Sequence, residues 1–475
     1  MTRTKVYLNG QWHEGTGWLE VCNPATGEVM AQAATVDGGM VRQALQDAQR
    51  ALPVWSALPA RERGRCLFKV ADHLEQNSEA MARLITQENG KPLTESRGEV
   101  AVAADHFRWF AEEGRRAYGR IVPPQAPGKR HLIFKRPVGV VAAISPWNFP
   151  LVLAARKVAP ALAAGCPVLL KPASATPLCA VQLAAAIDAA GLPPGAFQLL
   201  VGRAEEIAGE LLANPLCRKI TFTGSTAIGK KLIVGAAANV TKLSLELGGH
   251  APVLVFDDAD LTAAVKGTVG AKFRNTGQSC IAANRIYVQR GIYPRFVEAL
   301  IATVKSLKVG DGLSPGVDIG AMINEAGLNT ALTHIADAVQ RGARLATGGK
   351  RLGARGWFLE PTVLLDVPEQ ALCLTEETFA PVAPVCRFDT EAEAIARANA
   401  TVYGLAAYVF TRDLNRALRL GEQLEAGTIG INDAVPSTSN CPFGGIKQSG
   451  WGRELGAEGL EAFLETKHIS LGGVD

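Results

Sequence analysis

Short apolar runs alternate with longer Ala-rich segments between residues 137 and 256 of the chain. Five runs have the length and β-branched content of buried strands, at residues 138–144, 168–171, 197–201, 219–222 and 242–245. Four segments between them have helical length and are bounded by Gly or Pro, at residues 151–164, 177–190, 204–213 and 227–238. Because strands that alternate with helices form a parallel sheet, this pattern predicts a doubly wound α/β domain.

A second region of the same kind begins near residue 251. Its pattern predicts a strand at 253–256, a helix at 259–272 and further strands at 285–288 and 406–410. The charged segment 37–120 is helical in pattern, and we expect it to pack on the first domain. The expected units are therefore residues 1–117 with 137–249, residues 250–442, and two outlying strand-compatible pieces at 118–136 and 464–475. Taken alone, those two pieces indicate surface hairpin strands.

The composition narrows the class of protein. The chain has 475 residues, 48% hydrophobic and 20% charged, which suits a globular protein of two or three domains. A net charge of +4 without basic clusters gives no support for nucleic-acid binding. Its nine scattered cysteines lack metal-ligand spacing, so we expect no metal site, no disulfide framework and a cytoplasmic location. We expect no membrane segment either, since Arg156, Lys157 and Pro160 interrupt the apolar run at 151–170.

Cys280 is the candidate nucleophile. It ends the sequence Phe-Arg-Asn-Thr-Gly-Gln-Ser-Cys at 273–280, a small and polar approach that leaves a thiol open to substrate. Glu246, in Leu-Glu-Leu-Gly-Gly at 245–249, is the candidate base. The alternatives are an inert buried cysteine and a solvated glutamate at the end of a strand.

Both stretches belong to a set of six motifs that closely resemble the aldehyde dehydrogenase superfamily in type and order. The other four are Pro-Trp-Asn-Phe-Pro at 146–150, Phe-Thr-Gly-Ser-Thr at 222–226, Glu-Glu-Thr-Phe at 376–379 and Pro-Phe-Gly-Gly-Ile-Lys at 442–447. The resemblance covers nearly the whole chain. It implies an α/β fold with a Rossmann-type cofactor domain, a catalytic domain and a small β element through which subunits pair, as a homodimer or homotetramer.

The resemblance assigns three catalytic roles. Cys280 attacks the aldehyde, and the resulting thioester is hydrolysed with Glu246 as general base. Asn148 and the backbone N–H of the nucleophile form the oxyanion hole. The alternative for Asn148 is an N-cap of the helix that follows it.

The resemblance also implies a nicotinamide cofactor, NADP or NAD. Lys171 ends an apolar strand, where a cation can meet a nucleotide phosphate or ribose. Ser174 stands where family members strict for NAD commonly carry a glutamate, so a 2′-phosphate is not repelled and NADP should be accepted. The other implied cofactor residues are Ser145, Trp147, Gly224, Ser225, Glu377 and Phe379.

Within the superfamily the chain most resembles the succinate-semialdehyde dehydrogenases, through Lys-Phe-Arg-Asn at 272–275, Val-Gly-Asp-Gly at 309–312 and Val-Phe-Asp-Asp-Ala-Asp at 255–260. This resemblance implies a small aldehyde with a terminal carboxylate, held by Arg156, Arg274 and Ser437. The alternative for each arginine is a surface ion pair. The competing substrates are glutarate and 2-oxoglutarate semialdehydes, or a broader range of aldehydes.

Two further alternatives concern the class of protein. The scaffold could serve as a non-catalytic binding protein, but no catalytic position of the motifs is missing. A CoA-acylating enzyme would pass the thioester to CoA, and relatives of that type usually lack the base, so Glu246 favours hydrolysis.

Overall fold

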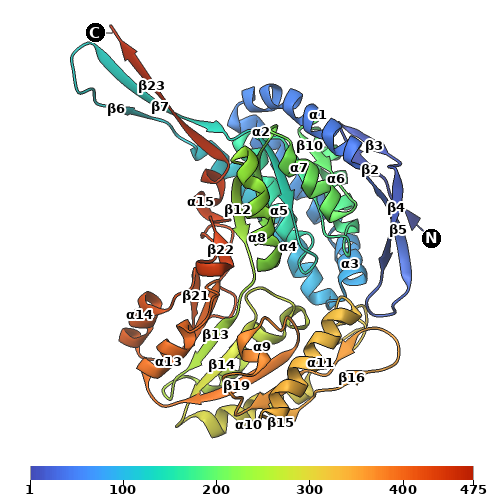
Figure 1. Cartoon of the computed structure of the whole chain (residues 1–475), viewed down its shortest axis with the longest axis vertical. Coiled ribbons are helices and arrows are strands. Elements are labelled where there is room, and N and C mark those ends of the chain that lie inside the picture. The colour runs from blue at the N-terminus through green and yellow to red at the C-terminus, as the bar shows by residue number, and fades with distance from the viewer. Residues whose placement is uncertain (1, 474–475) are drawn as a thin grey trace.

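A computed structural model of the chain, which describes residues 2–473, contains two α/β units and a projecting arm (Figure 1). The predicted fold class is confirmed. In Figure 1 the unit built mainly from the first half of the chain lies above the unit built mainly from the second half. In the part of the chain that the structure describes, no helix combines the length and the apolar character needed to cross a bilayer.

The first unit contains a six-stranded sheet in the order β10-β9-β8-β11-β12-β22. Its strands are β8 (Val140–Ile144), β9 (Val168–Lys171), β10 (Phe197–Leu199), β11 (Cys217–Thr223), β12 (Lys242–Glu246) and β22 (Gly450–Trp451). The first five are parallel, as predicted, and the short β22 joins β12 in antiparallel sense. The strand order reverses between β8 and β11, and ligands of such sheets bind at the carboxyl ends of the strands next to that reversal.

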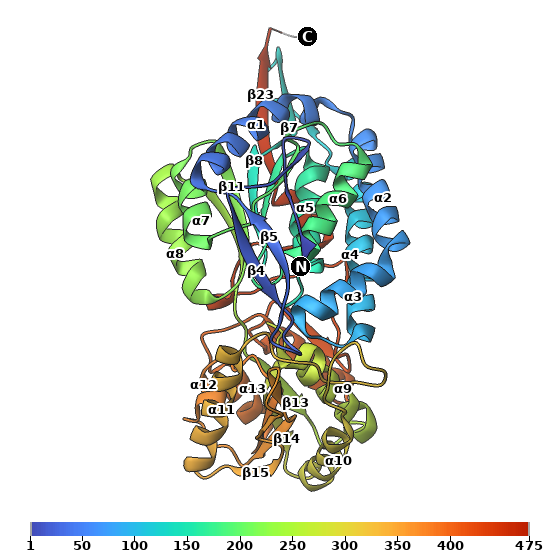
Figure 2. The ribbon, with the colours of Figure 1, turned by 90° about the vertical axis from the view of Figure 1, so that its right-hand side faces the viewer.

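Helices cover both faces of this sheet (Figure 2). They are α1 (Gly38–Ala57), α2 (Ala60–Gln76), α3 (Ser78–Asn89), α4 (Leu93–Glu113), α5 (Val152–Ala164), α6 (Leu178–Ala190), α7 (Ala204–Ala213) and α8 (Thr226–Ala236). In Figure 2, α7 and α8 lie on one side of the sheet, and α5 and α6 lie on the other with α2, α3 and α4 outside them. All thirteen residues of α5 are buried, including the consecutive cations Arg156 and Lys157, because α4 packs over it.

The second unit contains a seven-stranded sheet in the order β15-β18-β19-β14-β13-β20-β21, parallel except for β15. Its strands are β13 (Ala251–Val255), β14 (Ala283–Gln289), β15 (Arg344–Thr347), β18 (Thr362–Leu365), β19 (Val382–Phe388), β20 (Ala406–Phe410) and β21 (Thr428–Ile431). Its helices are α9 (Leu261–Phe273), α10 (Tyr293–Ser306), α11 (Glu325–Gln340), α12 (Leu372–Thr375), α13 (Glu391–Asn399) and α14 (Leu414–Gln423). The predicted elements of this region are confirmed.

Alternation along β13 shows how the second sheet is buried on both faces. Val253 and Val255 join the apolar cluster beneath α9 and α10, whereas Leu254 joins the cluster beneath α11 and α14. Side chains therefore cover both faces, which is the usual environment of a parallel sheet.

The two outlying pieces form one long arm with β6 (Arg120–Val122), β7 (Lys129–Pro137) and β23 (Leu464–Gly472) (Figure 1). β23 pairs with β7 in antiparallel register from Leu464 opposite Pro137 to Gly472 opposite Lys129. The strand prediction is therefore right, and the two pieces pair with each other within one chain. Residue 1 and residues 474–475, which belong to the predicted units, lie outside the described residues.

Smaller elements complete the chain. They are β1 (Thr2–Arg3), β2 (Val6–Leu8), β3 (Gln11–His13), β4 (Gly17–Cys22), β5 (Val29–Thr35), β16 (Arg351–Leu352), β17 (Phe358–Leu359) and α15 (Gly456–Glu461). The six-stranded sheet falls within the predicted segment 137–249 except for β22, and the seven-stranded sheet falls within 250–442. The functional assignment of these segments stays a prediction.

Candidate active site

Cys280 lies on the loop between α9 and β14, at the junction of the two units. A 3-10 turn at Arg274–Gly277 precedes it, and three consecutive residues of this turn, Asn275, Thr276 and Gly277, have positive φ angles of 50°, 56° and 72°. This backbone redirects the chain toward the first sheet. Gly249 makes the meeting possible, because a Cβ atom there would lie 2.2 Å from the carbonyl oxygen of Cys280.

The predicted nucleophile and base are in contact. Cys280 Sγ donates a hydrogen bond to Glu246 Oε1 at 3.3 Å, from the end of β12. Burial, followed by the nearby Glu246 charge, raises the pKa of the Cys280 thiol well above its ordinary value. The pKa of Glu246 is raised as well, by burial and then by the charge of Glu454. A raised pKa favours the protonated thiol, which agrees with Cys280 as the donor of this bond. Attack would require the thiol to lose that proton, and Glu246 is the acceptor in contact with it.

The second oxygen of Glu246 is available for proton transfer. Glu246 is only 3% exposed, and its Oε2 has no hydrogen-bond partner among the described residues. Behind it Lys157 Nζ donates to Thr223 Oγ1 at 2.6 Å and also to Glu454 Oε1. The positive charge of Lys157 opposes the rise in the pKa of Glu246.

Asn148, which follows β8, is held by its backbone. Its carbonyl oxygen accepts hydrogen bonds from Lys91 Nζ and from Asn275 Nδ2, both at 2.7 Å. Its side-chain Nδ2 donates to Gln278 O at 3.1 Å, two residues before the nucleophile. Since a carboxamide carries two N–H donors, one remains for an oxyanion beside Cys280.

The N-cap alternative for Asn148 is wrong. Helix α5 begins at Val152 and its N-terminal N–H groups bond to Glu99, whose Oε1 accepts from Leu151 N at 2.9 Å and from Val152 N at 3.2 Å. Glu99 also forms a fully buried ion pair with Lys91, at 2.7 Å. Lys91 and Glu99 thus hold the Asn148 peptide and the start of α5 together.

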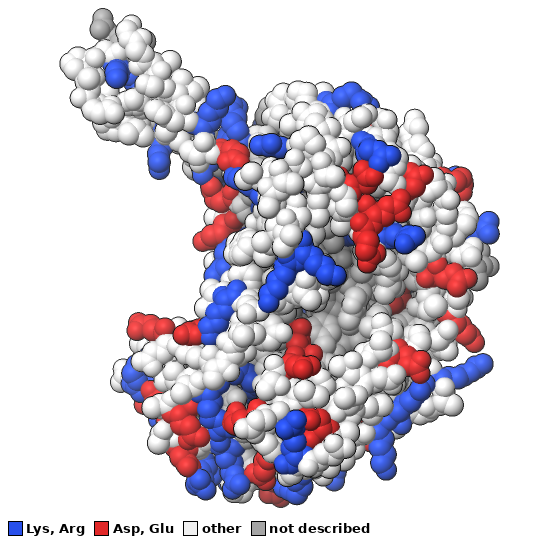
Figure 3. Space-filling model, in the orientation of Figure 1, with Lys and Arg blue, Asp and Glu red and all other residues white. Residues whose placement is uncertain are grey.

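Two hollows meet at Cys280. The first has about 630 Å³ of space between its atoms, and its walls are Pro146, Trp147, Asn148, Thr223, Gly224, Ser225, Leu247, Gly248, Cys280, Glu377 and Phe379. The second has about 640 Å³, and its walls are Glu99, Val102, Phe149, Val152, Leu153, Arg156, Arg274, Ser279, Cys280, Ile281, Val435, Ser437 and Phe443. The space-filling view shows a recess between the two units on the face of Figure 1 (Figure 3). We name the first, which contains Trp147 and Phe379, the aromatic hollow, and the second, which contains Arg156 and Arg274, the cationic hollow.

The aromatic hollow has the donors and surfaces that a nicotinamide dinucleotide needs. The Trp147 and Phe379 rings meet edge to face, with centroids 5.5 Å apart, and the Gly224–Ser225 turn opens helix α8, whose N–H groups suit a phosphate. Ser225 itself caps the helix by accepting from Ile228 N at 3.4 Å. Glu377 Oε1 accepts from Gly249 N at 3.2 Å, and burial raises the pKa of Glu377 to about 7.

Three further predicted cofactor residues, Ser145, Lys171 and Ser174, do not line this hollow. Ser145 follows β8 directly, and its hydroxyl is buried without a partner in the described residues. Lys171 ends β9, and burial lowers its pKa to about 8. Ser174 lies on the following loop, where its hydroxyl donates to Gly202 O at 3.5 Å. An unpaired buried hydroxyl and a buried cation at the carboxyl ends of neighbouring strands fit a polar, anionic ligand.

The cationic hollow contains two guanidinium groups. Arg156 Nη2 donates to Ser437 Oγ at 3.0 Å, and the Arg274 guanidinium lies 5.0 Å from the centre of the Phe149 ring. Within residues 2–473 neither arginine forms a salt bridge. The ion-pair alternative is therefore wrong for the described residues. The nearest opposite charges are those of Glu246, which interacts with Arg156, and of Glu95, which interacts with Arg274, and neither carboxylate contacts the guanidinium group directly.

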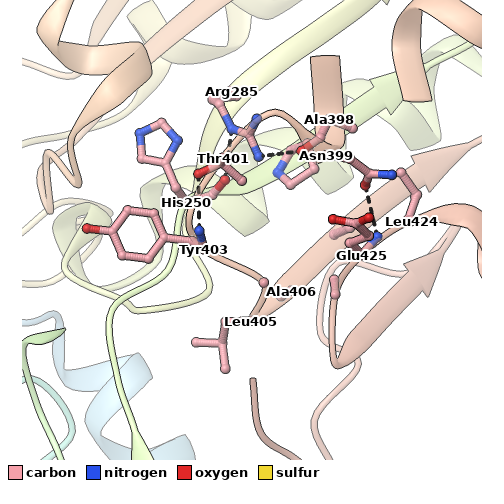
Figure 4. A pocket seen from close by; sticks show the side chains of 14 residues that line it. His250, Arg285, Ala398, Asn399, Thr401, Tyr403, Leu405, Ala406, Leu424 and Glu425 are labelled. Carbon is pink, nitrogen blue, oxygen red and sulfur yellow. Dashed lines mark hydrogen bonds between the residues drawn. The ribbon is translucent and has the colours of Figure 1, made fainter. Parts of the chain in front are cut away.

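A third, smaller hollow lies in the second unit, and neither Cys280 nor Glu246 lines it (Figure 4). Its central cation, Arg285, donates at 2.9 Å to three backbone carbonyls, those of His250, Arg397 and Ala398. Those bonds join strand β14 to neighbouring segments, so this arrangement supports the fold.

Several residues of the site have no signal in the sequence. Lys91, Glu99 and Glu454 are separated from their partners along the chain and belong to no motif. Lys157 was visible as a charge within an Ala-rich apolar helix, which is an unusual place for a lysine. Its buried bonds to Thr223 and Glu454 satisfy that charge.

Comparison with known proteins agrees with this geometry. Residues 12–469 match the aldehyde dehydrogenase family. The chain is 48% identical over 474 residues to a glutarate-semialdehyde dehydrogenase of Pseudomonas aeruginosa, covering 99% of this chain and 98% of the relative. It is also 48% identical over 472 residues to an NADP(+) succinate-semialdehyde dehydrogenase of Escherichia coli, with the same coverage. The crystal structure of an E. coli NADP dependent enzyme superposes with a TM-score of 0.98 at 47% identity, covering 99% of this chain and 98% of the other.

Proposed function

Because the chain belongs to the aldehyde dehydrogenase family, we propose that it oxidises an aldehyde with a terminal carboxylate, succinate semialdehyde foremost, to the corresponding acid. One observation carries the proposal: Cys280 lines both the aromatic hollow and a hollow with two guanidinium groups that form no salt bridge among the described residues. A carboxylate entering the cationic hollow would gain charge-assisted hydrogen bonds there. The names of the relatives, which cover succinate and glutarate semialdehydes, support this substrate class.

The first chemical step is addition of the thiol to the aldehyde. Cys280 Sγ attacks the carbonyl carbon while its proton passes to Glu246, which already accepts the hydrogen bond from that thiol. The negative charge that develops on the carbonyl oxygen is stabilised by the free N–H of Asn148 Nδ2. A single donor of this kind contributes about 3–4 kcal/mol to the transition state. The product is a thiohemiacetal on Cys280.

The next two steps give the acid. When bound, NADP+ or NAD+ supplies the acceptor for the hydride that leaves the thiohemiacetal carbon, which becomes a thioester. The residues that would hold this cofactor are Ser145, Trp147, Lys171, Ser174, Gly224, Ser225, Glu377 and Phe379. Glu246 must first release the proton from Cys280 to solvent. It then takes a proton from water, the hydroxide attacks the thioester, and Cys280 leaves as a thiolate. The acid is released without CoA.

The site is compatible with both forms of the cofactor, and we propose that NADP is accepted. Lys171 is a buried cation at the end of β9, and Ser174 adds no negative charge beside it. A 2′-phosphate would therefore meet a cation without a competing carboxylate from residue 174.

We also propose that the protein is a cytoplasmic homodimer or homotetramer in which the arm pairs subunits. The arm extends away from both units, and Ile121 on it is 77% exposed (Figure 1). The nine cysteines are free, which suits a reducing compartment. Sedimentation of the full-length protein is expected to show a dimer or tetramer, and a monomer at micromolar concentration would contradict the assembly.

Substitution of either substrate arginine should act selectively on charged aldehydes. We expect Arg156→Met and Arg274→Met each to lower kcat/KM for succinate semialdehyde by about 10–100-fold, since each removes a charged hydrogen-bond donor. Turnover of butanal, which lacks the carboxylate, should change much less. Steady-state kinetics with glutarate semialdehyde in parallel gives the length preference. A wild-type protein that oxidises butanal as well as the semialdehydes would refute the carboxylate assignment.

The affinity for NADP+ should depend on pH through Lys171. Its pKa of about 8 means that the ammonium loses its proton as pH rises from 7 to 9, and a neutral amine no longer attracts the 2′-phosphate. We therefore expect the Kd of NADP+ to rise over this range by up to about tenfold per pH unit above the pKa, while the Kd of NAD+ changes little. Titration calorimetry measures both. Lys171→Met should remove the difference, and an equal pH dependence for the two nucleotides would argue against this role.

A further inference from the structure

A chain of hydrogen-bonded side chains runs from Arg156 away from the cationic hollow toward the surface. Arg156 Nε bonds to His106 Nε2 at 3.3 Å, and His106 Nδ1 bonds to Ser439 Oγ at 2.8 Å. The Ser439 hydroxyl donates to Asp105 Oδ2. Helix α4 supplies Asp105 and His106, whereas Ser439 belongs to the loop that follows β21. Only Asp105 is exposed, since His106 is 1% and Ser439 5% accessible.

The chemistry of these groups fixes the direction of donation in this series of hydrogen bonds. A guanidinium nitrogen can only donate, so His106 Nε2 must accept and the imidazole proton must be on Nδ1. That proton is donated to Ser439, and the hydroxyl proton of Ser439 is donated to the Asp105 carboxylate. Burial, and then the charge of Arg156, hold the pKa of His106 well below its ordinary value, so the ring is neutral and keeps the lone pair that the arginine needs.

This series of hydrogen bonds restrains two groups that line the cationic hollow, the Arg156 guanidinium and the Ser437 hydroxyl. Arg156 is restrained through Nε by His106, through Nη2 by Ser437 Oγ at 3.0 Å, and through its face by the Phe443 ring, 4.8 Å from Cζ. Ser439 is two residues from Ser437, so its bonds to α4 hold the loop that carries that hydroxyl. Among the described residues no protein group bonds to Nη1 of Arg156, which leaves that edge for a ligand.

Arg274, the other cation of the hollow, is not restrained in this way. It is exposed, and its guanidinium contacts the Phe149 ring at 5.0 Å. Long side chains lose rotamer entropy when a ligand orders them, so a pre-ordered arginine binds a carboxylate at lower entropic cost. The ordered and geometrically selective half of the anion site is therefore the Arg156 half.

We propose that Asp105, Ser439 and His106 are positioning residues that set the preference for carboxylated over uncharged aldehydes by fixing the Arg156 guanidinium and the Ser437 hydroxyl. This inference rests on the proposed function and names residues outside the hollow as determinants of its selectivity. The same bonds also tie the loop after β21 to α4, so the experiment must separate a role in recognition from a role in the fold.

Ser439→Ala is the most direct variant, because it removes the hydroxyl that joins His106 to Asp105 in this series of hydrogen bonds. We expect kcat/KM for succinate semialdehyde relative to butanal to fall about tenfold, the size expected for one misplaced charged contact. The change should lie mainly in KM, because the affected contact holds a remote group and binds ground state and transition state alike. Ser439→Thr keeps the hydroxyl and should restore the ratio. Thr438→Ala, which removes an exposed hydroxyl from the same loop, is the matched control and should leave the ratio unchanged.

Asp105→Ala is the second variant, at an exposed position where truncation does not open the core. We expect it to lower kcat/KM for succinate semialdehyde relative to butanal about threefold. It tests the same inference if Ser439→Ala does not fold. Equal losses for both aldehydes with a lowered Tm, or an unchanged ratio in both variants, overturn the inference. An unselective wild type overturns the proposed function and this inference with it, whereas unchanged variants of a selective wild type overturn this inference alone.

Discussion

The hydrogen bond between Cys280 and Glu246 is the constraint on which the site depends, because it joins two units that are built separately. Glu246 ends a strand of the first sheet, and Cys280 precedes a strand of the second. The two backbones must approach so closely that residue 249 cannot carry a side chain, since a Cβ there would lie 2.2 Å from Cys280 O. The pair therefore lies where the two sheets meet. Cys280 lines both the aromatic and the cationic hollow.

The buried charges of the site fall into two groups. Some form ion pairs within the protein, whereas Arg156 forms none among the described residues. Lys91 with Glu99 and Lys157 with Glu454 are buried ion pairs, and a buried charge without a partner is strongly unfavourable. The Lys91–Glu99 pair holds the Asn148 peptide. The charges of the Lys157–Glu454 pair act on Glu246. Arg156 is nearly as well buried, at 9% exposure, yet its bonds go to neutral groups. A guanidinium group without a salt-bridge partner among the described residues can bond to a carboxylate, and this is the physical basis for an anionic substrate.

Much of the fold and of the candidate site could be predicted from local patterns. Alternation of apolar runs with Ala-rich segments indicated both parallel sheets, and the motifs named Cys280, Glu246 and Asn148, which the structure brings together. Strands β18, β19 and β21 were not predicted, and neither was the addition of β22 to the first sheet. β22 has two residues and pairs with a strand about two hundred positions away, so no local pattern marks it. The contacts of Ser439 with Asp105 and His106 join positions more than 330 residues apart, and they follow from tertiary packing alone.

The central claim is that Cys280 forms the covalent intermediate and that Glu246 activates the water that hydrolyses it. The most direct test is mass spectrometry of Glu246→Gln protein, quenched in acid after mixing with NADP+ and succinate semialdehyde. The account predicts that one equivalent of reduced cofactor forms per site, more slowly than in the wild type because the variant lacks the carboxylate that takes the thiol proton. It also predicts that an acyl group stays on the peptide that contains Cys280, with no such adduct in Cys280→Ala. Steady turnover of Glu246→Gln without an adduct, or an acyl group on another residue, would contradict the account.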